Sequence, residues 1–511
     1  MTPSKYQVDL YEWVKSGKGN AIVQAVAGSG KTTSALISMQ YMTEDVISLA
    51  FNKKIALELQ NRIGGMGLPN ASAATFHSVG LKAFSKSRGR KFRVFNSKIY
   101  NLVDGYCQEK EFWGAKNFIT KLVGFAKNYG VGIKGLSSID DDEVWMNLIT
   151  TQDLPMDFEC GVGDALDIAK NVLKDSNRNL LEIDFDDMIY LPLLHEMDFP
   201  QYDWIIIDEA QDTNVCRKLM LTKLLKTSGR LLAIGDKAQA IYMFTGAEND
   251  SMNLIKEQFN AIELPLSTCY RCGKKIVEEA RKYSANIEAF SSNGDGIVRS
   301  ESFEPFLENA PSYALTKEDG IVCRNNAPLV SLAFGLIRKG IGCRIEGRDI
   351  GNNLLTLCNK WKRVTDLNEF TERLIAFFDK EFDKKNNKAK LQLLEDKLET
   401  MVILIERCQS LGKNDVKSLA DLIKSMFSNA DETNVPNVVV LSSIHKAKGL
   451  EFDRCFILGM AQFQPSRYAV TEAALEQERN LQYVAVTRAK DELVYITDVP
   501  TRKSQDEGLM E

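Results

Sequence analysis

The chain has 511 residues, of which 44% are hydrophobic and 26% charged, and its formal net charge is −5 at pH 7. This length exceeds a single ordinary hydrophobic core and favours a globular protein of roughly two to four domains. No segment approaches the roughly 18 consecutive apolar residues of a membrane span, so we expect no membrane partner. The negative net charge excludes coating of nucleic acid by the whole surface, so any binding to nucleic acid requires a local basic groove.

The ten cysteines are scattered, which favours reduced thiols in a cytoplasm over a disulfide scaffold. Cys269 and Cys272 form a single CxxC pair. A structural zinc site needs two further ligands at suitable spacing, and the sequence has neither a second CxxC nor paired histidines. We therefore interpret this pair as free thiols.

The first chemical signal is a glycine-containing segment, residues 25–32, between the apolar run 21–25 and a helix-like stretch that starts at Thr33. Its glycines allow backbone N–H groups to curl around phosphate oxygens at a helix N-terminus. Lys31 supplies charge to the β- and γ-phosphates, and the Thr32 hydroxyl can ligate Mg²⁺. The pattern predicts a nucleotide-binding loop between a strand and a helix, and we expect the next strand at 46–51.

Residues 81–98 contain only basic charged side chains, which are Lys82, Lys86, Arg88, Arg90, Lys91, Arg93 and Lys98. Such a run is commonly a solvated loop or helix face. Its one-sidedness within an acidic protein favours a role in contacting phosphates. Residues 99–183 are then predicted to be mainly helical.

An apolar run at residues 204–207 predicts a buried parallel strand, and it ends in the adjacent carboxylates Asp208 and Glu209. Ligands bind at this end of strands in open α/β sheets, so one carboxylate can hold Mg²⁺ while its neighbour points at a water molecule. An acidic turn at a strand end is the alternative. The upstream phosphate loop favours the first interpretation and predicts hydrolysis of a nucleoside triphosphate.

The α/β pattern continues with a strand at 231–235 and resumes at about 320–347. A helical segment rich in lysine and glutamate follows. The later strands are expected at residues 437–442, 454–458 and 492–497. The whole pattern predicts two α/β cores, each interrupted by a helical insertion.

Seven further motifs occur in a fixed order, at residues 49–54, 75–78, 184–187, 234–242, 270–271, 443–452 and 478–489. Together they resemble the superfamily 1 DNA helicases of the UvrD/Rep/PcrA type, in a compact version, over about residues 2–497. The resemblance implies an α/β fold of two RecA-like P-loop domains, with parallel sheets flanked by helices and a mainly helical insertion in each.

The domain boundaries implied by the resemblance divide the chain into five parts. They are RecA-like domain 1 (ATP-binding) at 1–84 and 184–266, helical insertion 1B at 85–183, RecA-like domain 2 at 267–347 and 434–500, a reduced helical insertion 2B at 348–433, and a mobile tail at 501–511.

ATP and Mg²⁺ are the cofactors that the resemblance implies. Its catalytic residues would be Lys31, Asp208, Glu209, Gln239, Arg271 and Arg488. Thr32 and Asp208 would hold the metal, Glu209 would orient or deprotonate the attacking water, and Gln239 would sense the γ-phosphate. Both arginines would act as arginine fingers from the second domain, so that hydrolysis depends on closure of the cleft.

The residues implied to contact ATP are Gln7, Ala27, Gly28, Ser29, Gly30, Lys31, Thr32, Thr33, Tyr270 and Glu451. Tyr270 would stack on the adenine and Gln7 would read its edge. Bacterial relatives often have an arginine at the position of Thr33. The residues implied to bind DNA are Phe51, Asn52, Thr75, His77, Tyr242, Phe244 and His445. Aromatic rings stack on bases without reading sequence, while hydroxyl and imidazole groups contact phosphates.

The leading expectation is an ATP-dependent DNA helicase that moves 3′ to 5′ on single-stranded DNA and unwinds duplexes, in the cytoplasm of a bacterial or phage-infected cell. Its partners would be single-stranded DNA, junctions between single- and double-stranded DNA, and a loading or nuclease protein. One alternative is a translocase that displaces proteins or serves a nuclease. Relatives carry a strand-separating hairpin after the arginine matched by Arg488, and here that hairpin is expected to be truncated or absent. An inactive DNA-binding scaffold is the remaining alternative.

Overall fold

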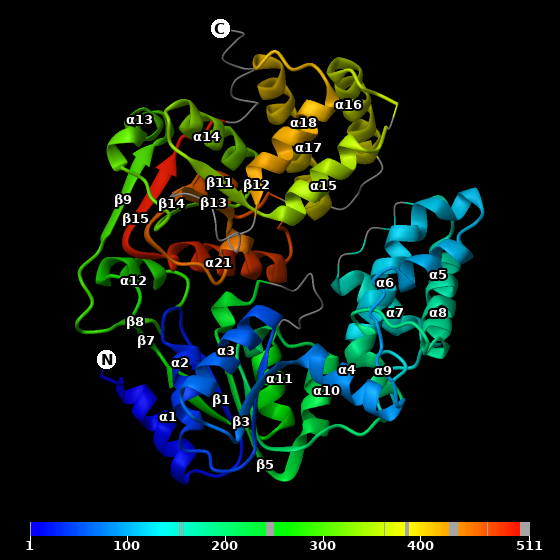
Figure 1. Cartoon of the computed structure of the whole chain (residues 1–511), viewed down its shortest axis with the longest axis vertical. Helices are drawn as coiled ribbons and strands as arrows, with labels where there is room; N and C mark the ends of the chain where they lie inside the picture. Colours follow the sequence, from blue (N-terminus) through cyan, green and yellow to red (C-terminus); the bar gives the residue numbers. More distant parts are fainter. Residues whose placement is uncertain are drawn as a thin grey trace. The chain divides into compact units, whose positions relative to one another are not determined.

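The structure, a computed structural model, describes residues 2–152, 154, 156, 158–241, 250–361, 363–383, 388–428, 438–467 and 469–500. The chain divides into two compact units, Met1–Thr268 and Cys269–Glu511 (Figure 1). Each unit contains a parallel sheet flanked by helices, which confirms the predicted α/β fold class. The predicted tail at 501–511 lies outside the described residues.

Unit 1 contains a six-stranded parallel sheet in the order β3-β2-β4-β5-β1-β6. The strands are β1 (Ala21–Ala25), β2 (Val46–Ala50), β3 (Ala71–Thr75), β4 (Tyr202–Ile207), β5 (Leu225–Gly235) and β6 (Ile262–Leu266). Parallel neighbours require crossover connections, and helices supply them. Strand β1 lies between β5 and β6 and is parallel to both. The loop that follows it therefore emerges at the carboxyl edge of the sheet, where α/β folds bind ligands.

The helices of unit 1 fall into two groups. Those of the α/β part are α1 (Lys5–Ser16), α2 (Lys31–Met39), α3 (Lys53–Gly65), α4 (Phe76–Ser87), α9 (Asp187–Leu194), α10 (Val215–Leu224) and α11 (Ser251–Gln258). Those of the first insertion are α5 (Lys98–Tyr106), η1 (Lys110–Ala115), α6 (Lys116–Asn128), α7 (Asp142–Thr151) and α8 (Val162–Arg178).

The apolar side chains of β4 lie in two hydrophobic cores, one on each face of the sheet, because successive side chains of a strand point to opposite faces. Ile206 packs in the core that α1, α2 and α3 form on one face. Ile205 and Ile207 pack in the core on the other face, which continues through Phe118 of α6 and Trp145 of α7. The first insertion therefore shares a hydrophobic core with the sheet.

The helices α4 and α9 cross at Gly80, where any larger residue would collide with the neighbouring backbone. A Cβ atom at this position would lie 2.1 Å from the carbonyl oxygen of Met188. The close crossing places the start of α4 beside the segment that precedes α9, and this arrangement matters for the site described below.

Unit 2 contains a seven-stranded parallel sheet in the order β12-β11-β13-β10-β14-β15-β9. The strands are β9 (Ile297–Ser302), β10 (Asp319–Cys323), β11 (Cys343–Glu346), β12 (Phe427–Ser428), β13 (Val439–Ser443), β14 (Phe452–Leu458) and β15 (Ala489–Thr497). A two-stranded sheet of β7 (Thr268–Cys269) and β8 (Glu288–Ala289) precedes it in the chain.

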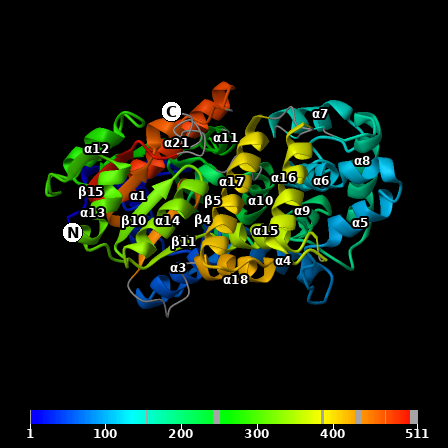
Figure 2. The same ribbon diagram turned by 90° about the horizontal axis from the view of Figure 1, so that it is seen from above.

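The helices that flank this sheet are α12 (Lys274–Ala280), α13 (Phe303–Asn309), η5 (Ala310–Tyr313), α14 (Ala327–Arg338), α19 (Ile444–Ala447), α20 (Met460–Phe463) and α21 (Glu472–Val486). The second insertion contributes α15 (Arg348–Cys358), α16 (Leu367–Asp383), α17 (Lys388–Ser410) and α18 (Val416–Met426). Within it α16 and α17 run side by side (Figure 2).

The second insertion also shares a core with its sheet. Ile321 of β10 and Leu441 of β13 belong to the same buried cluster as Phe370, Leu404 and Leu419 of the insertion helices. The insertion is not wholly helical, because Phe427 and Ser428, its last described residues, form the strand β12, which pairs with β11.

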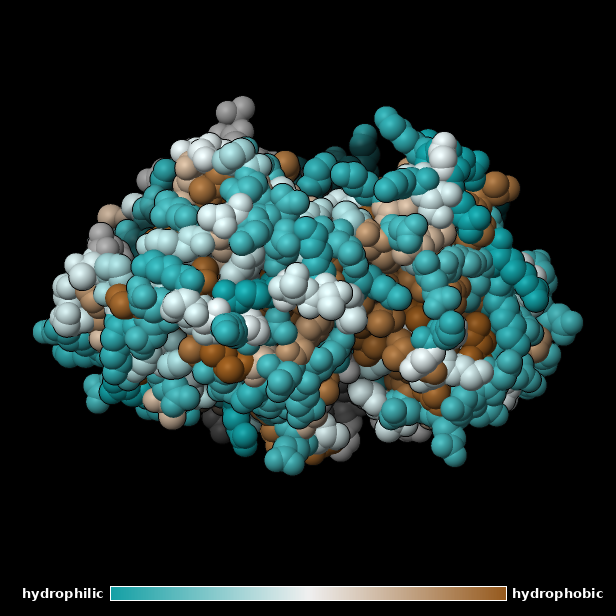
Figure 3. All heavy atoms as spheres, turned by 90° about the horizontal axis from the view of Figure 1, so that it is seen from below, coloured by the Kyte–Doolittle hydropathy of each residue, from teal (hydrophilic) through white to brown (hydrophobic). Residues whose placement is uncertain are grey.

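The surface of the molecule is mainly polar on the face seen in Figure 3, where apolar residues gather in smaller patches. Within the described part of the chain, no helix combines the length and the apolar character needed to cross a membrane. All ten cysteines are free thiols.

Candidate functional site

The loop after β1 has the backbone shape that the glycine pattern predicts. Gly28 and Gly30 adopt left-handed conformations, with φ of 67° and 76°, which residues with a Cβ atom rarely tolerate. Gly30 is also the N-cap of α2, so the loop leads directly into a helix N-terminus. Ser29 is 1% exposed, and its Oγ has no hydrogen-bond partner among the described residues. A buried hydroxyl without a partner, at a helix N-terminus that lacks a side-chain cap, fits a phosphate ligand.

The Thr32 hydroxyl and the Asp208 carboxylate meet across this loop. Oγ1 of Thr32 donates a hydrogen bond to Oδ2 of Asp208, with 2.7 Å between the oxygens. Burial raises the pKa of Asp208 to about 6, and the charge of Glu209 adds to this, while the hydrogen bond from Thr32 and the charge of Lys31 act in the opposite direction. A divalent cation would favour the ionised carboxylate.

This pair fits a magnesium site of the nucleotide-dependent kind. Mg²⁺ is commonly held by one or two protein oxygens together with substrate phosphates. The described residues contain no cluster of three or more histidine, cysteine, aspartate or glutamate side chains that could hold a metal ion without a ligand. Thr32 and Asp208 would therefore share Mg²⁺ with the phosphates of a nucleotide.

Glu209 has a left-handed backbone conformation, with φ of 55°, although it is not glycine. Such conformations cost roughly 1–3 kcal/mol and are often found at functional sites. Its carboxylate accepts a hydrogen bond from Nε2 of Gln211. Oε1 of Gln211 in turn accepts from the backbone N–H of Asp236 at 2.9 Å. Gly235 allows this approach, because a Cβ there would lie 2.7 Å from Oε1 of Gln211.

Gln239, in the short helix η3 (Lys237–Gln239), joins the same network. Its Nε2 donates to Oδ2 of Asp236 at 2.6 Å. Burial raises the pKa of Asp236, and the charge of Lys31 is the largest influence that opposes this rise. Sequence reasoning had assigned no role to Gln211, which follows the acidic pair, or to Asp236, which lies in the motif at 234–242. The structure shows that they connect Glu209 with Gln239.

Gln7 lies beside the phosphate loop. A Cβ atom on Gly30 would be 3.5 Å from Nε2 of Gln7, and this nitrogen donates a hydrogen bond to Oγ of Ser34 at 2.9 Å. Oε1 of Gln7 accepts from the backbone N–H of Ser4, as part of a capping box at the start of α1. The helix start thus fixes the Gln7 side chain next to the N-terminal turn of α2, which includes Thr33.

Four of the DNA-contact residues predicted in unit 1 lie at the carboxyl ends of two neighbouring strands: Phe51 and Asn52 follow β2, Thr75 ends β3 and His77 comes just after it. Asn52 caps α3, and its Oδ1 accepts from the backbone N–H of Ile55 at 2.9 Å. Thr75 caps α4, and its Oγ1 accepts from the backbone N–H of Ser78 at 3.1 Å. The guanidinium of Arg217, which sequence reasoning had missed, lies 4.7 Å from the ring centroid of Phe51. Tyr242 and Phe244 lie outside the described residues.

His77 stacks on Phe185, with ring centroids 3.8 Å apart. Burial and the charge of Arg217 lower the pKa of His77 to about 3, so the imidazole is neutral at physiological pH. Phe185 was quoted within a motif but given no role, and its side chain is 53% exposed. Because His77 is only 7% exposed, the aromatic surface at this place is mainly the Phe185 ring, and the neutral imidazole packs beneath it.

One residue of the basic run was misplaced by sequence reasoning. Lys98 is 1% exposed, and its Nζ donates to Oδ2 of Asp187 at 2.6 Å and to the backbone oxygen of Ser176 at 2.9 Å. A buried lysine with these partners cannot reach a phosphate. The other basic residues of the run, Lys82, Lys86, Arg88, Arg90, Lys91 and Arg93, are exposed.

Unit 2 brings together a second group of predicted residues. Nη2 of Arg271 pairs with Oε2 of Glu451 at 2.7 Å, and its Nη1 donates to the backbone oxygen of Thr487 at 3.3 Å. Arg488 is 1% exposed, and its guanidinium donates to the backbone oxygens of Val484 and Leu450 at 2.9 and 2.8 Å. Both arginines are thus oriented by neighbours inside their own unit.

The two other predicted residues of unit 2 have aromatic rings. The ring of Tyr270 lies 4.6 Å from that of Phe290. His445 is partly buried at the start of α19. Burial, with the charges of Arg324 and Lys446, lowers the pKa of His445 to about 3, so this histidine is also neutral at physiological pH.

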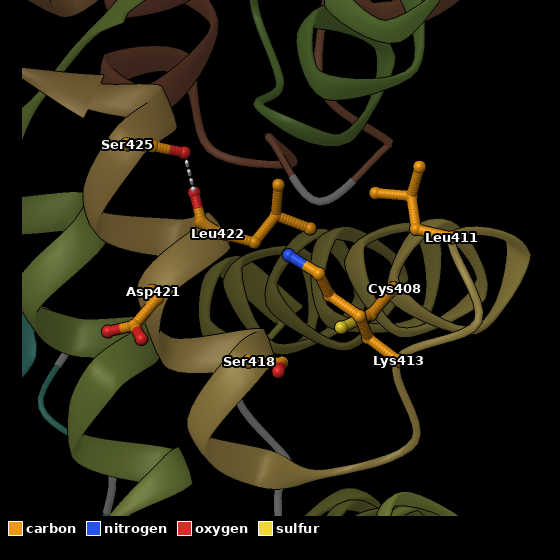
Figure 4. Close-up of a pocket in the computed structure, with 7 residues that line it drawn as sticks. All are labelled: Cys408, Leu411, Lys413, Ser418, Asp421, Leu422 and Ser425. Atoms are coloured by element: carbon orange, nitrogen blue, oxygen red, sulfur yellow. Dashed lines mark hydrogen bonds between the residues drawn. The ribbon is translucent and has the colours of Figure 1, made fainter.

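A cavity of about 190 Å³ lies elsewhere, between the end of α17 and α18. Its lining includes Cys408, Lys413 and Asp421 (Figure 4). None of the predicted site residues lines it, and its side chains do not converge on a common point, so the candidate site rests on the two groups described above.

Comparison with known proteins matches both halves of the chain. A family model described as the UvrD/REP helicase N-terminal domain matches residues 8–260, and one described as the UvrD-like helicase C-terminal domain matches residues 243–499. The chain is 23% identical to the ATP-dependent DNA helicase PcrA of Bacillus subtilis, over 96% of this chain and 82% of the relative. It is 22% identical to the ATP-dependent DNA helicase Rep of Escherichia coli, over 93% and 88%. A probable DNA helicase II homolog of Mycoplasma genitalium is 23% identical, over 95% and 84%.

Proposed function

The chain belongs to the UvrD/Rep family of helicases, and on this premise we propose that it hydrolyses ATP with Mg²⁺ to move 3′ to 5′ along single-stranded DNA and to separate the strands of a duplex. The names of the relatives support ATP and DNA as substrates. The direction of movement rests on the sequence resemblance alone.

The observation that carries the proposal is the pairing of the Thr32 hydroxyl and the Asp208 carboxylate, 2.7 Å apart, beside the phosphate loop. Phosphoryl transfer depends on positioning and on neutralising charge. Lys31 and the loop N–H groups would hold the β- and γ-phosphates in place. Bound Mg²⁺, held by Thr32 and Asp208, would neutralise charge on the same phosphates.

Glu209 is the residue proposed to orient the attacking water and to accept its proton. Its backbone is left-handed, and the hydrogen bond from Gln211 holds one oxygen of its carboxylate. Gln239 is the residue proposed to sense the γ-phosphate. Hydrogen bonds through Asp236 and Gln211 connect its side chain to the Glu209 carboxylate.

Arg271 and Arg488 are proposed to stabilise the charge that develops on the transferred phosphoryl group. Glu451 and backbone carbonyl groups hold the two guanidinium groups in defined orientations within unit 2. Tyr270 is proposed to stack on the adenine.

DNA is proposed to contact Phe51, Asn52, Thr75, His77 and His445. Because both histidines are neutral, they would contribute stacking and hydrogen bonds rather than charge. Base stacking does not discriminate between sequences. We expect DNA binding to depend weakly on sequence and to weaken with salt through contacts from basic residues.

The test of the site is ATP hydrolysis with and without a single-stranded oligonucleotide. Lys31→Ala and Glu209→Gln are each expected to lower DNA-stimulated turnover by more than about 100-fold, as loss of a key electrostatic contact does. Binding of the oligonucleotide, measured by fluorescence anisotropy, should be retained in both variants.

Glu196→Gln is the matched control, because Glu196 is also a glutamate of unit 1 with a left-handed backbone, with φ of 46°, but its side chain is 57% exposed. Turnover of this control should equal that of the wild type. Substantial hydrolysis by both Lys31→Ala and Glu209→Gln would refute the site assignment.

Directional unwinding is tested on duplexes with a 3′ or a 5′ single-stranded tail. Unwinding of only the 3′-tailed duplex is expected. Preference for the 5′ tail would contradict the proposed polarity, and ATP-driven displacement of a bound protein without unwinding would indicate a translocase instead.

A further inference from the structure

The second insertion supplies a buried carboxylate to the start of a core helix in unit 2. Asn326 is the N-cap residue of α14, but its own side chain does not cap the helix. Asp396 of α17, which is 9% exposed, replaces this cap. Its Oδ1 accepts from the backbone N–H groups of Asn326 and Ala327 at 2.8 and 2.9 Å, and its Oδ2 accepts from Nδ2 of Asn326 at 2.9 Å.

Helix N-terminal N–H groups are normally satisfied by a side chain adjacent in sequence. Here the acceptor comes from a helix of the insertion, so the cap ties two separate parts of the chain together. The position also favours a negative charge, because the N-terminal end of α14 is partially positive. Burial raises the pKa of the Asp396 carboxyl, while its three hydrogen bonds and the charge of Arg324 oppose that rise.

The capped turn begins with Arg324, which follows β10. The guanidinium of Arg324 donates to Oε1 of Glu478, from Nε at 3.0 Å and from Nη2 at 2.8 Å. The Glu478 side chain is 6% exposed and lies on α21. Such charge-assisted pairs fix geometry as well as contributing energy. Because α21 ends at Val486, this ion pair holds the helix that leads into Arg488.

We infer that Asp396 is a positioning residue for ATP hydrolysis: by capping α14 from the insertion, it fixes the turn from Arg324 to Ala327 and, through Glu478, the helix that places Arg488. This inference rests on the proposed role of Arg488. It gives the second insertion a defined part in the chemistry, which Asp396 exerts through α14 and Glu478.

The test compares three variants of the full chain, Asp396→Ala, Asp396→Asn and Asp415→Ala, for ATP hydrolysis stimulated by a single-stranded oligonucleotide. Asp415 is the matched control because it caps α18 within the same insertion. Its Oδ1 accepts from the backbone N–H of Ser418 at 2.8 Å, and its Oδ2 accepts from Oγ of Ser418 at 2.7 Å. Both alanine variants lose an aspartate cap, but only one loses contact with α14.

We expect Asp396→Ala to lower kcat about tenfold while KM for ATP changes little, because misplaced catalytic groups slow the reaction more than they weaken binding. Asp415→Ala should keep kcat within about twofold of the wild type, with a comparable loss of thermal stability of roughly 2–4 °C in Tm. Asp396→Asn should recover most of kcat, because the amide oxygen still accepts both backbone N–H bonds.

Equal kcat values for Asp396→Ala and Asp415→Ala would overturn the inference, as would an Asp396→Asn variant no faster than Asp396→Ala. If Asp396→Ala does not fold, Asp396→Ser replaces it, because the shorter hydroxyl does not reach both backbone N–H groups of α14, and this variant is combined with Glu478→Gln. If the double variant loses less kcat than the product of the two single losses, the two residues act through a shared path. If the two losses simply multiply, the inference is refuted. A wild-type chain without DNA-stimulated hydrolysis would instead refute the proposed function.

Discussion

Both insertions share a hydrophobic core with the sheet of their unit. In unit 1 a cluster of buried ion pairs also joins the insertion to the rest of the unit, whereas in unit 2 the buried carboxylate of Asp396 caps a core helix. Nζ of Lys127, on α6, lies 2.6 Å from both Asp184 and Asp187, and Lys98 of α5 completes the cluster. These side chains are at most 8% exposed. In unit 2, Asp396 is a buried charged residue that joins the insertion to the rest of the unit, and its carboxylate accepts mainly from backbone N–H groups.

The difference matters because removing one partner of a buried ion pair costs more stability than removing a buried helix cap. Bringing charges out of water costs several kcal/mol per ion, and removal of one partner leaves the other charge uncompensated. Loss of a cap leaves only neutral N–H groups without acceptors. Both insertions nevertheless reach the start of a core helix: Asp396 at α14, and Asn128 at α10, where Nδ2 of the N-cap residue Asn214 donates to Oδ1 of Asn128 at 2.7 Å.

The largest effect is expected for Lys127→Met, which keeps the side-chain length but removes the charge. Asp184 and Asp187 would remain buried without this partner, and unit 1 should lose about 3–5 kcal/mol of unfolding free energy. Urea unfolding followed by tryptophan fluorescence measures the loss. Lys134→Met is the control, since Lys134 pairs with Glu196 at 3.5 Å while 81% exposed. A loss as small as that of the control would mean that the charges do not anchor the insertion.

A smaller effect is expected for Asn128→Ala. The change removes the acceptor of Asn214 and the donor to Asp186, whose Oδ1 lies 3.2 Å from Nδ2 of Asn128. Loss of these partly buried bonds should cost about 1–3 kcal/mol. Asn147→Ala on the exposed face of α7 is the control, and its Oδ1 accepts only from Thr151. If both variants were equally stable, the hydrogen bond from α10 to the insertion would contribute nothing to the free energy of unfolding.

The third expected effect is a dependence of the stability of unit 1 on pH. Burial, with the charge of Asp184, raises the pKa of Asp186 to about 6. The folded state therefore binds a proton more tightly than the unfolded state, whose carboxyl titrates near its ordinary value of about 4. The contribution of Asp186 to stability is present below about pH 4 and is lost as the pH rises to about 6. Asp186→Asn should flatten this part of the stability profile, which unfolding at a series of pH values can measure. An unchanged slope between pH 4 and 6 would contradict this assignment.

The parts of the fold with strong local signals could be predicted from the sequence. The runs of β1 and β4 are apolar, as in buried strands, and a phosphate loop and an acidic pair follow them. The structure places Thr32, after β1, beside Asp208, after β4, as a shared magnesium site needs. The strand β3 was not predicted, because its sequence consists largely of alanine, which has little preference for strands.

The contacts that sequence reasoning missed connect distant segments. Phe185 meets His77 only because α4 and α9 cross closely at Gly80. Lys98 was taken as part of a phosphate-contacting run, since nothing in its neighbourhood signals the buried partner Asp187 on another helix. Pairing of this kind depends on packing between elements, and local patterns do not encode it.

The order of the strands has a consequence for synthesis of the chain. In β1, Ala21 lies beside Leu232 of β5 and Ile262 of β6, so both neighbours of this strand are made after the entire first insertion. The nucleotide loop has no completed sheet beneath it until those residues leave the ribosome. Contacts within the insertion are closer in sequence, and local contacts form faster. We therefore expect the helices of the insertion to form first on the nascent chain, while β1 remains without either neighbour and available to chaperones.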